Sequence, residues 1–448
     1  MNLQNISRVY LIGVGGIGMS ALARYFTANG CTVSGYDKTP SRLTQELEKE
    51  GIEIHFEESL ASLDKQAQLI IYTPAIPAEH AGLVWYQEND FSLLKRSDVL
   101  KLITENQRAI CVAGTHGKTT VSAMISHLLT QEGFGTNAFL GGIAANYDTN
   151  YIKSENDCVV VEADEYDRSF LKLFPDISVV TSMDADHLDI YGTAEEMEKA
   201  YYQFVNASTE VVFYKHGLKQ AKNFTVKEEI TYSAQNDAAT YYAQNVTTKN
   251  GSYQFEICTS GDVLIKVTLN MGGMHNVENC VAAFGVAHYI GLDIEKLGIA
   301  IENFKGVRRR FEYVIKNEKQ IYIDDYAHHP EELTQLIKST NSLFRNEKVA
   351  VVFQPHLFSR TKDHAAGFAR ALDLADEVIL LDIYPARELP MDGVDSKMIL
   401  NKMGLDNKHI LSKEGAVEWA KNRKPKVLIT AGAGDIDQLV EPIKKVLS

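Results

Sequence analysis

Residues 113–120 (AGTHGKTT) have the residue types and spacing of a loop that binds phosphate groups. Glycines let backbone N–H groups surround an anion, the Lys118 ammonium would meet the β- and γ-phosphates, and the Thr119 hydroxyl would bind Mg²⁺. Val112 stands where the common GxxxxGK[ST] pattern has its first glycine, which weakens the match to the generic loop. A turn without a ligand is the alternative, and His116 could equally be a turn residue or a substrate contact. We expect nucleotide contacts from Gly114, Thr115, His116, Gly117, Lys118, Thr119 and Thr120.

Acidic and imidazole side chains follow two expected strands farther along the chain. Glu162 ends the expected strand at residues 159–162, and His187 lies just beyond the one at residues 177–181. The carboxyl ends of such strands meet at one edge of the sheet, where ligands bind. Mg²⁺ accepts few protein carboxylates, so Glu162 and the Thr119 hydroxyl are a plausible inner set, and His187 would serve a second ion. For each residue alone, a helix cap or a packed histidine is the simpler interpretation.

A second glycine-rich run, GVGGIG at residues 13–18, follows an expected strand and opens an expected helix. Its backbone N–H groups and the helix N-terminus can hold a diphosphate. Taken alone, the run with a downstream acid favours a nicotinamide or flavin dinucleotide about as much as any other use of the loop. A tight turn without a ligand is a further alternative. The candidate binding residues are Gly13, Gly15, Gly16, Gly18 and Asp37.

Three further segments carry polar side chains that could reach a ligand. Residues 271–279 (MGGMHNVEN) precede an apolar helix and on their own indicate only a helix start. The run RRRFE at residues 308–312, which includes Arg310, would ordinarily be a solvated charge cluster. Residues 323–330 (IDDYAHHP) and 353–361 (FQPHLFSRT) lie at strand ends. A metal site on the adjacent histidines is disfavoured, because neighbouring histidines seldom bind one ion together.

The elements that must position these motifs repeat the same strand, turn and helix pattern three times. We therefore predict an α/β fold with three domains, at residues 1–106, 107–308 and 309–448. An alternating polar pattern at residues 253–258 and 263–269 predicts a small antiparallel part within the central domain. The expected strands lie at residues 9–14, 32–36, 69–72, 109–113, 159–162, 177–181, 321–324, 349–353, 377–381 and 426–430, and the clearest helices at 19–29, 41–51 and 280–290.

Composition excludes several classes of protein. The 448 residues carry a formal net charge of −14, which argues against a nucleic-acid-binding protein, because phosphate neutralisation needs clustered cations. No apolar run approaches the roughly 18 to 20 residues needed to cross a bilayer, and no secretory leader opens the chain. The five scattered cysteines show no CxxC spacing and predict reduced, mostly buried thiols in the cytoplasm.

In combination, these motifs resemble the Mur ligase and folylpolyglutamate synthetase superfamily. Residues 113–120 match its AxGTxGKTxx loop despite Val112, and residues 273–279 resemble its G-x-H-N-x-x-N motif. DDYxHHP at residues 324–330 and FQPHxxSR at 353–360 resemble the alanine-adding Mur ligases in particular. Residues 381–388 and 431–435 look like the last two strand-end loops of the family, so the resemblance spans essentially the whole chain.

The resemblance implies a Rossmann-like N-terminal domain whose glycine loop, with Asp37, binds UDP-N-acetylmuramate. It implies a central P-loop ATPase-type domain that binds ATP with Mg²⁺, for which Mn²⁺ can substitute, and a Rossmann-like C-terminal domain that binds L-alanine. The lactyl carboxylate would be phosphorylated to an acyl phosphate and then attacked by the alanine amine. Since an amino acid needs a cation for its carboxylate, Arg360 is the matched candidate.

The same resemblance implies the roles of individual residues, in a monomer or homodimer. The residues implied in catalysis are Lys118, His187, Arg310 and His356, with Thr119, Glu162 and His187 at the metal. Those implied in further nucleotide contacts are His275, Asn276 and Asn279. Those implied around the amino acid are Arg310, Tyr326, His356 and Arg360.

Alternative functions explain only some of the motifs or require a different substrate. A murein peptide ligase, which adds a recycled tripeptide to the same nucleotide sugar, shares most loops and differs in the size of the amine. An NAD-dependent dehydrogenase would explain residues 13–18 and Asp37 but not residues 114–120. A non-enzymatic scaffold would need no metal-binding residues at all.

Overall fold

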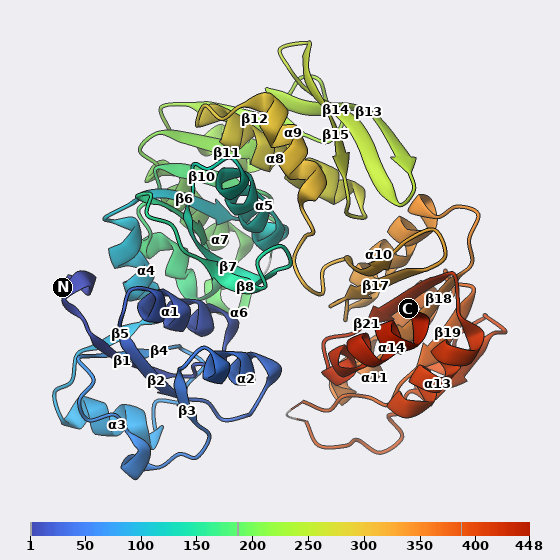
Figure 1. The fold of residues 1–448 in the computed structure, drawn as a ribbon, viewed down its shortest axis with the longest axis horizontal. Helices are drawn as coiled ribbons and strands as arrows, with labels where there is room; N and C mark the ends of the chain where they lie inside the picture. The colour runs from blue at the N-terminus through green and yellow to red at the C-terminus, as the bar shows by residue number, and fades with distance from the viewer. Residues whose placement is uncertain (1, 186–187, 387) are drawn as a thin grey trace. The chain divides into compact units, whose positions relative to one another are not determined.

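The computed structural model describes residues 2–185, 188–386 and 388–448, and within them the chain forms three β-sheets with helices beside them (Figure 1). The contacts divide the chain into two compact units. The first unit runs to Ala243 and takes in Ile257–Ile265 and Glu278–Ile301. The second consists of Gln244–Glu256, Lys266–Val277 and Glu302–Ser448. The predicted α/β fold with three domains is confirmed, whereas the predicted domain boundaries stay predictions.

The first sheet has five parallel strands in the order β3-β2-β1-β4-β5. Four of the five residues of β1 are buried, as expected of a parallel strand covered on both faces. The order reverses at β1, and such sheets bind ligands at the strand ends beside this reversal. The strands are β1 (Arg8–Ile12), β2 (Thr32–Tyr36), β3 (Glu53–His55), β4 (Leu69–Tyr72) and β5 (Leu93–Lys95), and the helices are α1 (Ile17–Ala28), α2 (Arg42–Lys49), α3 (Ala81–Glu88) and α4 (Arg96–Thr104).

The second sheet has ten strands in the order β15-β14-β13-β12-β11-β10-β6-β9-β7-β8. β6 lies between β9 and β10 and is parallel to both, while β8 is antiparallel to β7. The strands are β6 (Arg108–Ala113), β7 (Asn137–Ala144), β8 (Thr149–Ile152), β9 (Cys158–Glu162), β10 (Ile177–Val180), β11 (Val211–Lys215), β12 (Glu229–Ser233), β13 (Tyr241–Lys249), β14 (Ser252–Thr259) and β15 (Asp262–Leu269), and the helices are α5 (Lys118–Gln131), α6 (Leu188–Tyr191), α7 (Ala194–Asn206), α8 (Met274–Tyr289) and α9 (Ile294–Asn303).

The small antiparallel part lies at one end of the ten-stranded sheet. β13 and β14 are neighbours joined by residues 250–251, and β14 and β15 are neighbours joined by residues 260–261. Connections this short join antiparallel strands, since a parallel pair needs a crossover of a dozen or more residues. The predicted antiparallel segment is confirmed.

The third sheet, in the second unit, has the order β16-β17-β21-β18-β19-β20 and is parallel except for the edge strand β16. β18 at its centre is fully buried, whereas β16 is mostly half-buried. The strands are β16 (Glu312–Lys316), β17 (Ile321–Asp325), β18 (Val349–Phe353), β19 (Glu377–Leu380), β20 (Lys408–Ile410) and β21 (Val427–Ala431), and the helices are α10 (Pro330–Leu343), α11 (Phe358–Leu372), α12 (Lys397–Leu400), α13 (Lys413–Arg423) and α14 (Val440–Leu447).

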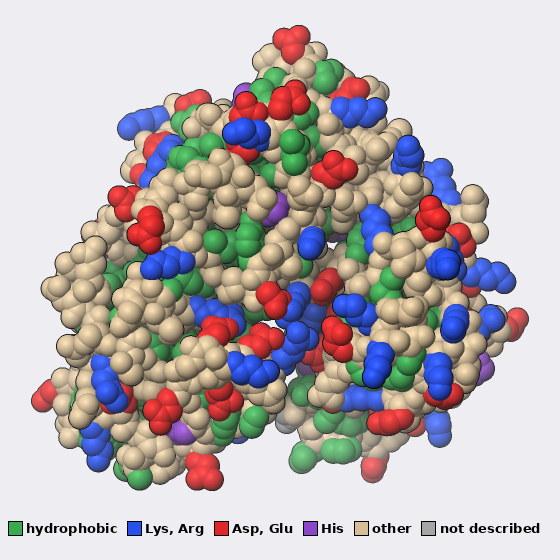
Figure 2. Space-filling model, in the orientation of Figure 1, with side chains coloured by type: hydrophobic (Ala, Val, Ile, Leu, Met, Phe, Trp, Pro, Cys, Tyr) green, Lys and Arg blue, Asp and Glu red, His purple; other side chains and the backbone are tan. Residues whose placement is uncertain are grey.

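The surface is mixed in charge, and the thiols lie inside. Figure 2 shows basic and acidic side chains interspersed over the face in view. All five cysteines are buried, as predicted. Across the part of the chain that the structure describes, no helix combines the length and the apolar character needed to cross a membrane.

Candidate active site

The loop between β6 and α5 is held tightly by the segment that follows β10. Gly114 and Gly117 have φ angles of 136° and 83°. Residues other than glycine seldom adopt these backbone conformations. A Cβ atom on Gly114 would lie 2.8 Å from the Ser182 amide nitrogen, so the close approach also requires glycine there. The Ser182 hydroxyl accepts a hydrogen bond from the His116 amide at 2.9 Å. The loop is therefore already shaped, with the N-terminus of α5 behind it.

The Lys118 ammonium lies inside this loop and contacts three oxygen atoms. Its Nζ atom donates to the Gly114 carbonyl oxygen at 2.6 Å and lies 2.8 Å from each carboxylate oxygen of Glu165. The Glu165 side chain is only 1% exposed. Burial raises the pKa of Glu165, and the ammonium opposes that shift. An ammonium has three protons, so Lys118 must give up at least one of these contacts to donate to a phosphate.

One predicted magnesium ligand, Glu162, lies next to helix α5, which carries another, Thr119. Glu162 ends β9, and its Oε1 atom lies 3.4 Å from the hydroxyl of Ser122 on the first turns of α5, the helix that carries Thr119 one turn earlier. A Cβ atom on Gly141 would lie 3.0 Å from that Oε1 atom, so the glycine leaves room for the carboxylate. Carboxylate and hydroxyl oxygens suit Mg²⁺. The third predicted ligand, His187, lies outside the described residues.

The other predicted nucleotide residues differ in where they lie. Thr120 is buried, and the Thr115 hydroxyl is 2.8 Å from that of Ser182. His116 is 75% exposed, 3.8 Å from the Asp184 carboxylate. Asn279 lies against the loop between β6 and α5. If Gly117 carried a Cβ atom, that atom would be only 3.0 Å from Asn279 Oδ1.

His275 and Asn276 belong to the second compact unit. The Asn276 side chain is buried and donates to the Gly272 carbonyl oxygen at 2.7 Å. The His275 ring packs against Gly273, where an added Cβ would lie 2.7 Å from Nδ1. Their predicted contact with a nucleotide stays a prediction.

The glycine-rich loop after β1 uses several of its own amide groups internally. The Gly13 and Val14 amides donate to the Tyr36 carbonyl oxygen at 2.8 and 3.0 Å. The Gly15 amide donates to Asp37 Oδ2 at 2.8 Å, and the Gly16 amide to the Gly13 carbonyl oxygen at 3.2 Å. Asp37 therefore contacts the loop backbone directly, and its role in binding a ligand stays a prediction.

A cation that the sequence analysis did not single out lies against Gly18. A Cβ atom on Gly18 would be 3.1 Å from Cζ of Arg96, at the start of α4. The Arg96 guanidinium also lies 3.2 Å from Asp164 Oδ2, in the segment that follows β9. Its positive charge therefore stands between the glycine-rich loop and the acidic residues of the central sheet. The sequence carried no clear signal for Arg96, because the three-residue strand β5 before it is too short to show a period.

In the second unit, the turn that carries Arg310 is fixed by a half-buried carboxylate. Asp325, at the end of β17, accepts hydrogen bonds from the Phe311 and Ala327 amides, each at 2.7 Å. Arg309 and Phe311 on either side of Arg310 have φ angles of 60° and 48°. Non-glycine residues seldom adopt such angles, so the surrounding hydrogen bonds must hold this turn in its conformation. The Arg309 guanidinium also stacks 5.0 Å from the Tyr326 ring.

The predicted amino-acid residues His356 and Arg360 lie together at the carboxyl end of β18. Arg360 Nη1 is 3.4 Å from His356 Nδ1, and the His356 ring stacks on Tyr384 at 5.8 Å. Glu388 accepts a hydrogen bond from the Ser359 amide at 2.9 Å, at the start of α11. Tyr384 and Glu388 were noted in the sequence only as part of a strand-end loop, and the structure places both against this cluster.

Comparison with protein families agrees with this geometry along the whole chain. The description "Mur ligase family, catalytic domain" matches residues 8–108, "Mur ligase middle domain" matches residues 112–287, and "Mur ligase, glutamate ligase domain" matches residues 309–434. The chain belongs to the Mur ligase family. The predicted family is thereby confirmed.

Several individual proteins are similar to this Mur ligase over nearly its whole length. UDP-N-acetylmuramate–L-alanine ligase of Flavobacterium johnsoniae is 46% identical over 100% of this chain and 99% of its own. The ligase of the same name from Porphyromonas gingivalis is 46% identical, over 99% of each chain. The UDP-N-acetylmuramate-alanine ligase structure from Thermotoga maritima superposes with a TM-score of 0.83, at 27% identity and 98% coverage of each chain. A murein peptide ligase from Psychrobacter arcticus shares the fold, with a TM-score of 0.66 and 19% identity.

The Lys118–Glu165 pair of this Mur ligase leads to a prediction about nucleotide affinity. Because Glu165 competes with phosphate for the ammonium, Glu165→Gln should tighten ADP binding by about tenfold. Isothermal titration of ADP into wild type and variant checks this. The Glu198→Gln variant, which changes an acid of α7 instead, is the control. Weaker ADP binding by Glu165→Gln would mean that the carboxylate supports the ammonium instead of competing for it.

The stability of the protein is expected to depend on pH through the two aspartates at the end of β17. Burial raises the pKa of Asp324 to about 7 and that of Asp325 to about 6. The native state therefore holds these protons more tightly than the unfolded state, and its stability falls as the pH rises from about 4 to about 7.

The Asp324→Asn variant should lose much of this pH dependence, on the order of 3 kcal/mol between those two pH values. Urea unfolding followed at both pH values measures the difference from wild type. Arg309 Nε lies 3.4 Å from Asp324 Oδ2, and its positive charge opposes part of the rise in the Asp324 pKa that burial causes. Equal pH slopes in wild type and variant would contradict the assignment.

Proposed function

We propose that this Mur ligase uses ATP to join L-alanine to the lactyl carboxylate of UDP-N-acetylmuramate. The products are UDP-N-acetylmuramoyl-L-alanine, ADP and phosphate. The structural observation that carries the proposal is the Lys118 ammonium, set within a preformed glycine loop and paired with the Glu165 carboxylate. The alanine-adding names of relatives at 46% identity over nearly full length support the choice of substrates.

In the first step, the carboxylate attacks the γ-phosphorus of ATP, ADP leaves, and an acyl phosphate forms. Phosphoryl transfer depends mainly on alignment and neutralisation of charge, so Lys118 and the α5 N-terminus suit this step without a covalent nucleophile. Thr119 and Glu162 would hold Mg²⁺, or Mn²⁺ in its place, and His187 is the proposed further ligand. The bound ion supplies positive charge to the phosphate oxygens.

In the second step, the amine of L-alanine attacks the acyl carbon and phosphate leaves. Arg360 is proposed to bind the alanine carboxylate through its guanidinium, as planar two-donor groups do best. Tyr326 and His356 are proposed around the amino acid, and Arg310 and His356 are proposed to act in catalysis. Support for the amino-acid set comes from its shared strand end, with Arg360 and His356 3.4 Å apart.

The glycine-rich loop after β1 is proposed to bind the diphosphate of the nucleotide sugar. Gly13, Gly15, Gly16 and Gly18 let the ligand approach the backbone, and Asp37 orders the loop through the Gly15 amide. Arg96 beside Gly18 adds the positive charge that a diphosphate needs. His275, Asn276 and Asn279 are proposed to approach the ATP, and the position of Asn279 next to Gly117 supports its part in this proposal.

We further propose that the enzyme acts in the cytoplasm as a monomer or homodimer. Five buried cysteines suit a reducing compartment. Neither nucleic acid nor a membrane is proposed as a partner, because the net charge of −14 disfavours the former.

The test is phosphate release from ATP with Mg²⁺ and UDP-N-acetylmuramate, comparing L-alanine with the tripeptide L-Ala-D-Glu-meso-diaminopimelate. Release with L-alanine is the expected result. Release only with the tripeptide would make the protein a peptide-recycling ligase. Release with neither amine would overturn the proposed substrates.

A further inference from the structure

The side-chain amide of Asn150, in β8, forms hydrogen bonds to the first turns of helix α1. Its Oδ1 atom accepts from Arg24 Nη1 at 2.5 Å, and its Nδ2 atom donates to the Ile17 carbonyl oxygen at 2.6 Å and to the Ser20 hydroxyl at 2.9 Å. The side chain is 0% exposed. A buried amide costs free energy unless its hydrogen bonds are made, and here three are made to one helix.

The turn that Asn150 grips belongs to the glycine-rich loop. Ile17 lies between Gly16 and Gly18, and the Ser20 amide donates to the Gly16 carbonyl oxygen at 2.8 Å. The Ser20 hydroxyl also donates to the Ile17 carbonyl oxygen at 2.9 Å. At Ile17, Asn150 therefore contacts the backbone of the glycine-rich loop that is proposed to bind the diphosphate.

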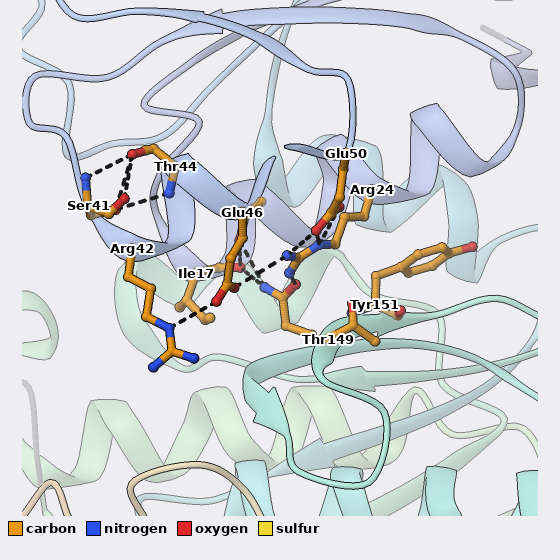
Figure 3. A network of polar contacts seen from close by, with 11 residues as sticks. Ile17, Arg24, Ser41, Arg42, Thr44, Glu46, Glu50, Thr149 and Tyr151 are labelled. Atoms are coloured by element: carbon orange, nitrogen blue, oxygen red, sulfur yellow. Dashed lines mark hydrogen bonds and ion pairs between the residues drawn. The ribbon is translucent and has the colours of Figure 1, made fainter. Parts of the chain in front are cut away.

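A second part of the network links helix α1 to the end of helix α2 through Arg24 and Glu50 (Figure 3). Arg24 is 6% exposed, and its guanidinium contacts Glu50, the residue that follows α2, at 2.7 to 3.1 Å. At the opposite end of α2, a Cβ atom on Gly15 would lie 2.7 Å from Thr44. Through Arg24, Asn150 is thus connected to α2 as well as α1, and α2 lies against the loop at Gly15.

Asn150 itself belongs to the ten-stranded sheet that carries the ATP loop. β8 pairs with β7, and β7 pairs with β9, which ends at Glu162. Resting on the proposed function, we propose that Asn150 is a positioning residue for the nucleotide-sugar site. It fixes the glycine-rich loop on the central sheet, so that the diphosphate binds to a loop already in place.

The same two elements offer a matched control. Lys153, just after β8, donates to the Ala28 carbonyl oxygen at 2.7 Å, at the far end of α1. Lys153→Ala also removes a contact between the central sheet and α1, but it leaves the turn at Ile17 untouched. A residue that serves only to dock the helix would give the same result at either end.

The experiment measures binding of UDP-N-acetylmuramate and, separately, of ADP to the full chain by isothermal titration. Asn150→Ala should weaken UDP-N-acetylmuramate binding by about tenfold or more, with ADP binding changed by less than about twofold. Ser20→Ala, which removes one hydroxyl of the network, should give a smaller loss of about threefold, and Lys153→Ala no loss. In turnover, Asn150→Ala should raise KM for the nucleotide sugar with kcat nearly unchanged.

Three results would overturn the proposal. They are wild-type affinity for the nucleotide sugar in Asn150→Ala, equal losses for the nucleotide sugar and ADP, and an equal loss in Lys153→Ala. If Asn150→Ala does not fold, wild-type affinity in Ser20→Ala overturns it. A wild-type protein that binds ADP but not UDP-N-acetylmuramate would refute the proposed substrate instead, and so the two failures are distinguishable.

Discussion

Replacing Lys118 with alanine is expected to lower ATP-dependent phosphate release by about a thousandfold. The ammonium is the cation that lies inside the loop after β6, held by the Gly114 carbonyl oxygen and Glu165. Without it, the charge that develops on the transferring phosphoryl group loses its nearest side-chain partner. Steady-state phosphate release at saturating substrates measures the effect.

Stability must be separated from catalysis in this experiment. Lys118→Ala leaves the buried Glu165 carboxylate without its ammonium partner, which destabilises a protein by about 3 to 5 kcal/mol. The variant is therefore best made together with Glu165→Gln and compared with Glu165→Gln alone. Lys172→Ala, which removes a lysine 2.5 Å from Asp98, is the matched control and should keep its activity. Phosphate release within about tenfold of the Glu165→Gln rate would contradict the role of Lys118.

Replacing Arg360 with alanine is expected to raise KM for L-alanine by about a hundredfold and to leave KM for ATP unchanged. A guanidinium that pairs with a carboxylate through two hydrogen bonds contributes a few kcal/mol to binding, and the amino acid is too small to offer many other contacts. The measurement is phosphate release against L-alanine concentration, with the two other substrates saturating.

Two further variants make this result specific to Arg360. Arg360→Lys keeps the charge but not the planar pair of donors, so it should recover only part of the affinity. Arg370→Ala changes an arginine in the last turn of the same helix and should behave as wild type. An unchanged KM for L-alanine in Arg360→Ala would move the amino-acid carboxylate to another cation, with Arg310 as the next candidate.

The sequence predicted several inner strands because their residues carry the signal, but β7, β11 and β12 of the central sheet were not among the expected strands. The strands at residues 32–36, 69–72 and 349–353 have their predicted limits, since each is a run of mostly apolar or β-branched residues ended by polar ones. The edge strands β3, β5 and β20 went unpredicted, because three residues cannot show a period. β16 was missed because its burial is only partial.

One helix start was also misplaced. The helix expected from residue 280 begins at Met274, so residues 274–279, which were expected to precede it, form its first turns. The Asn276 side chain bonds back to the Gly272 carbonyl oxygen, so a residue type that usually marks a cap continues the helix here. The local composition favoured the cap, and the tertiary surroundings decided otherwise.

The part of the candidate site that lies in one contiguous motif could be predicted from the sequence. The contacts between residues far apart in the sequence could not. Residues 113–120 identify a phosphate loop by themselves. The pairing of Lys118 with Glu165, 47 residues away, and the approach of Arg96 to Gly18 depend on which strand ends meet. Asn150 showed no signal at all, because one asparagine in a strand acquires its meaning only from the helix that packs on it.

The distribution of the buried thiols makes the two compact units separately observable. Cys31, Cys111, Cys158, Cys258 and Cys280 all belong to the first unit, and each is at most 9% exposed. Thiol modification in increasing denaturant would therefore report the opening of that unit alone, with no chemical background from the other. For the same reason, a single cysteine placed on the surface of the second unit could carry a fluorescent label without any of the native cysteines being removed.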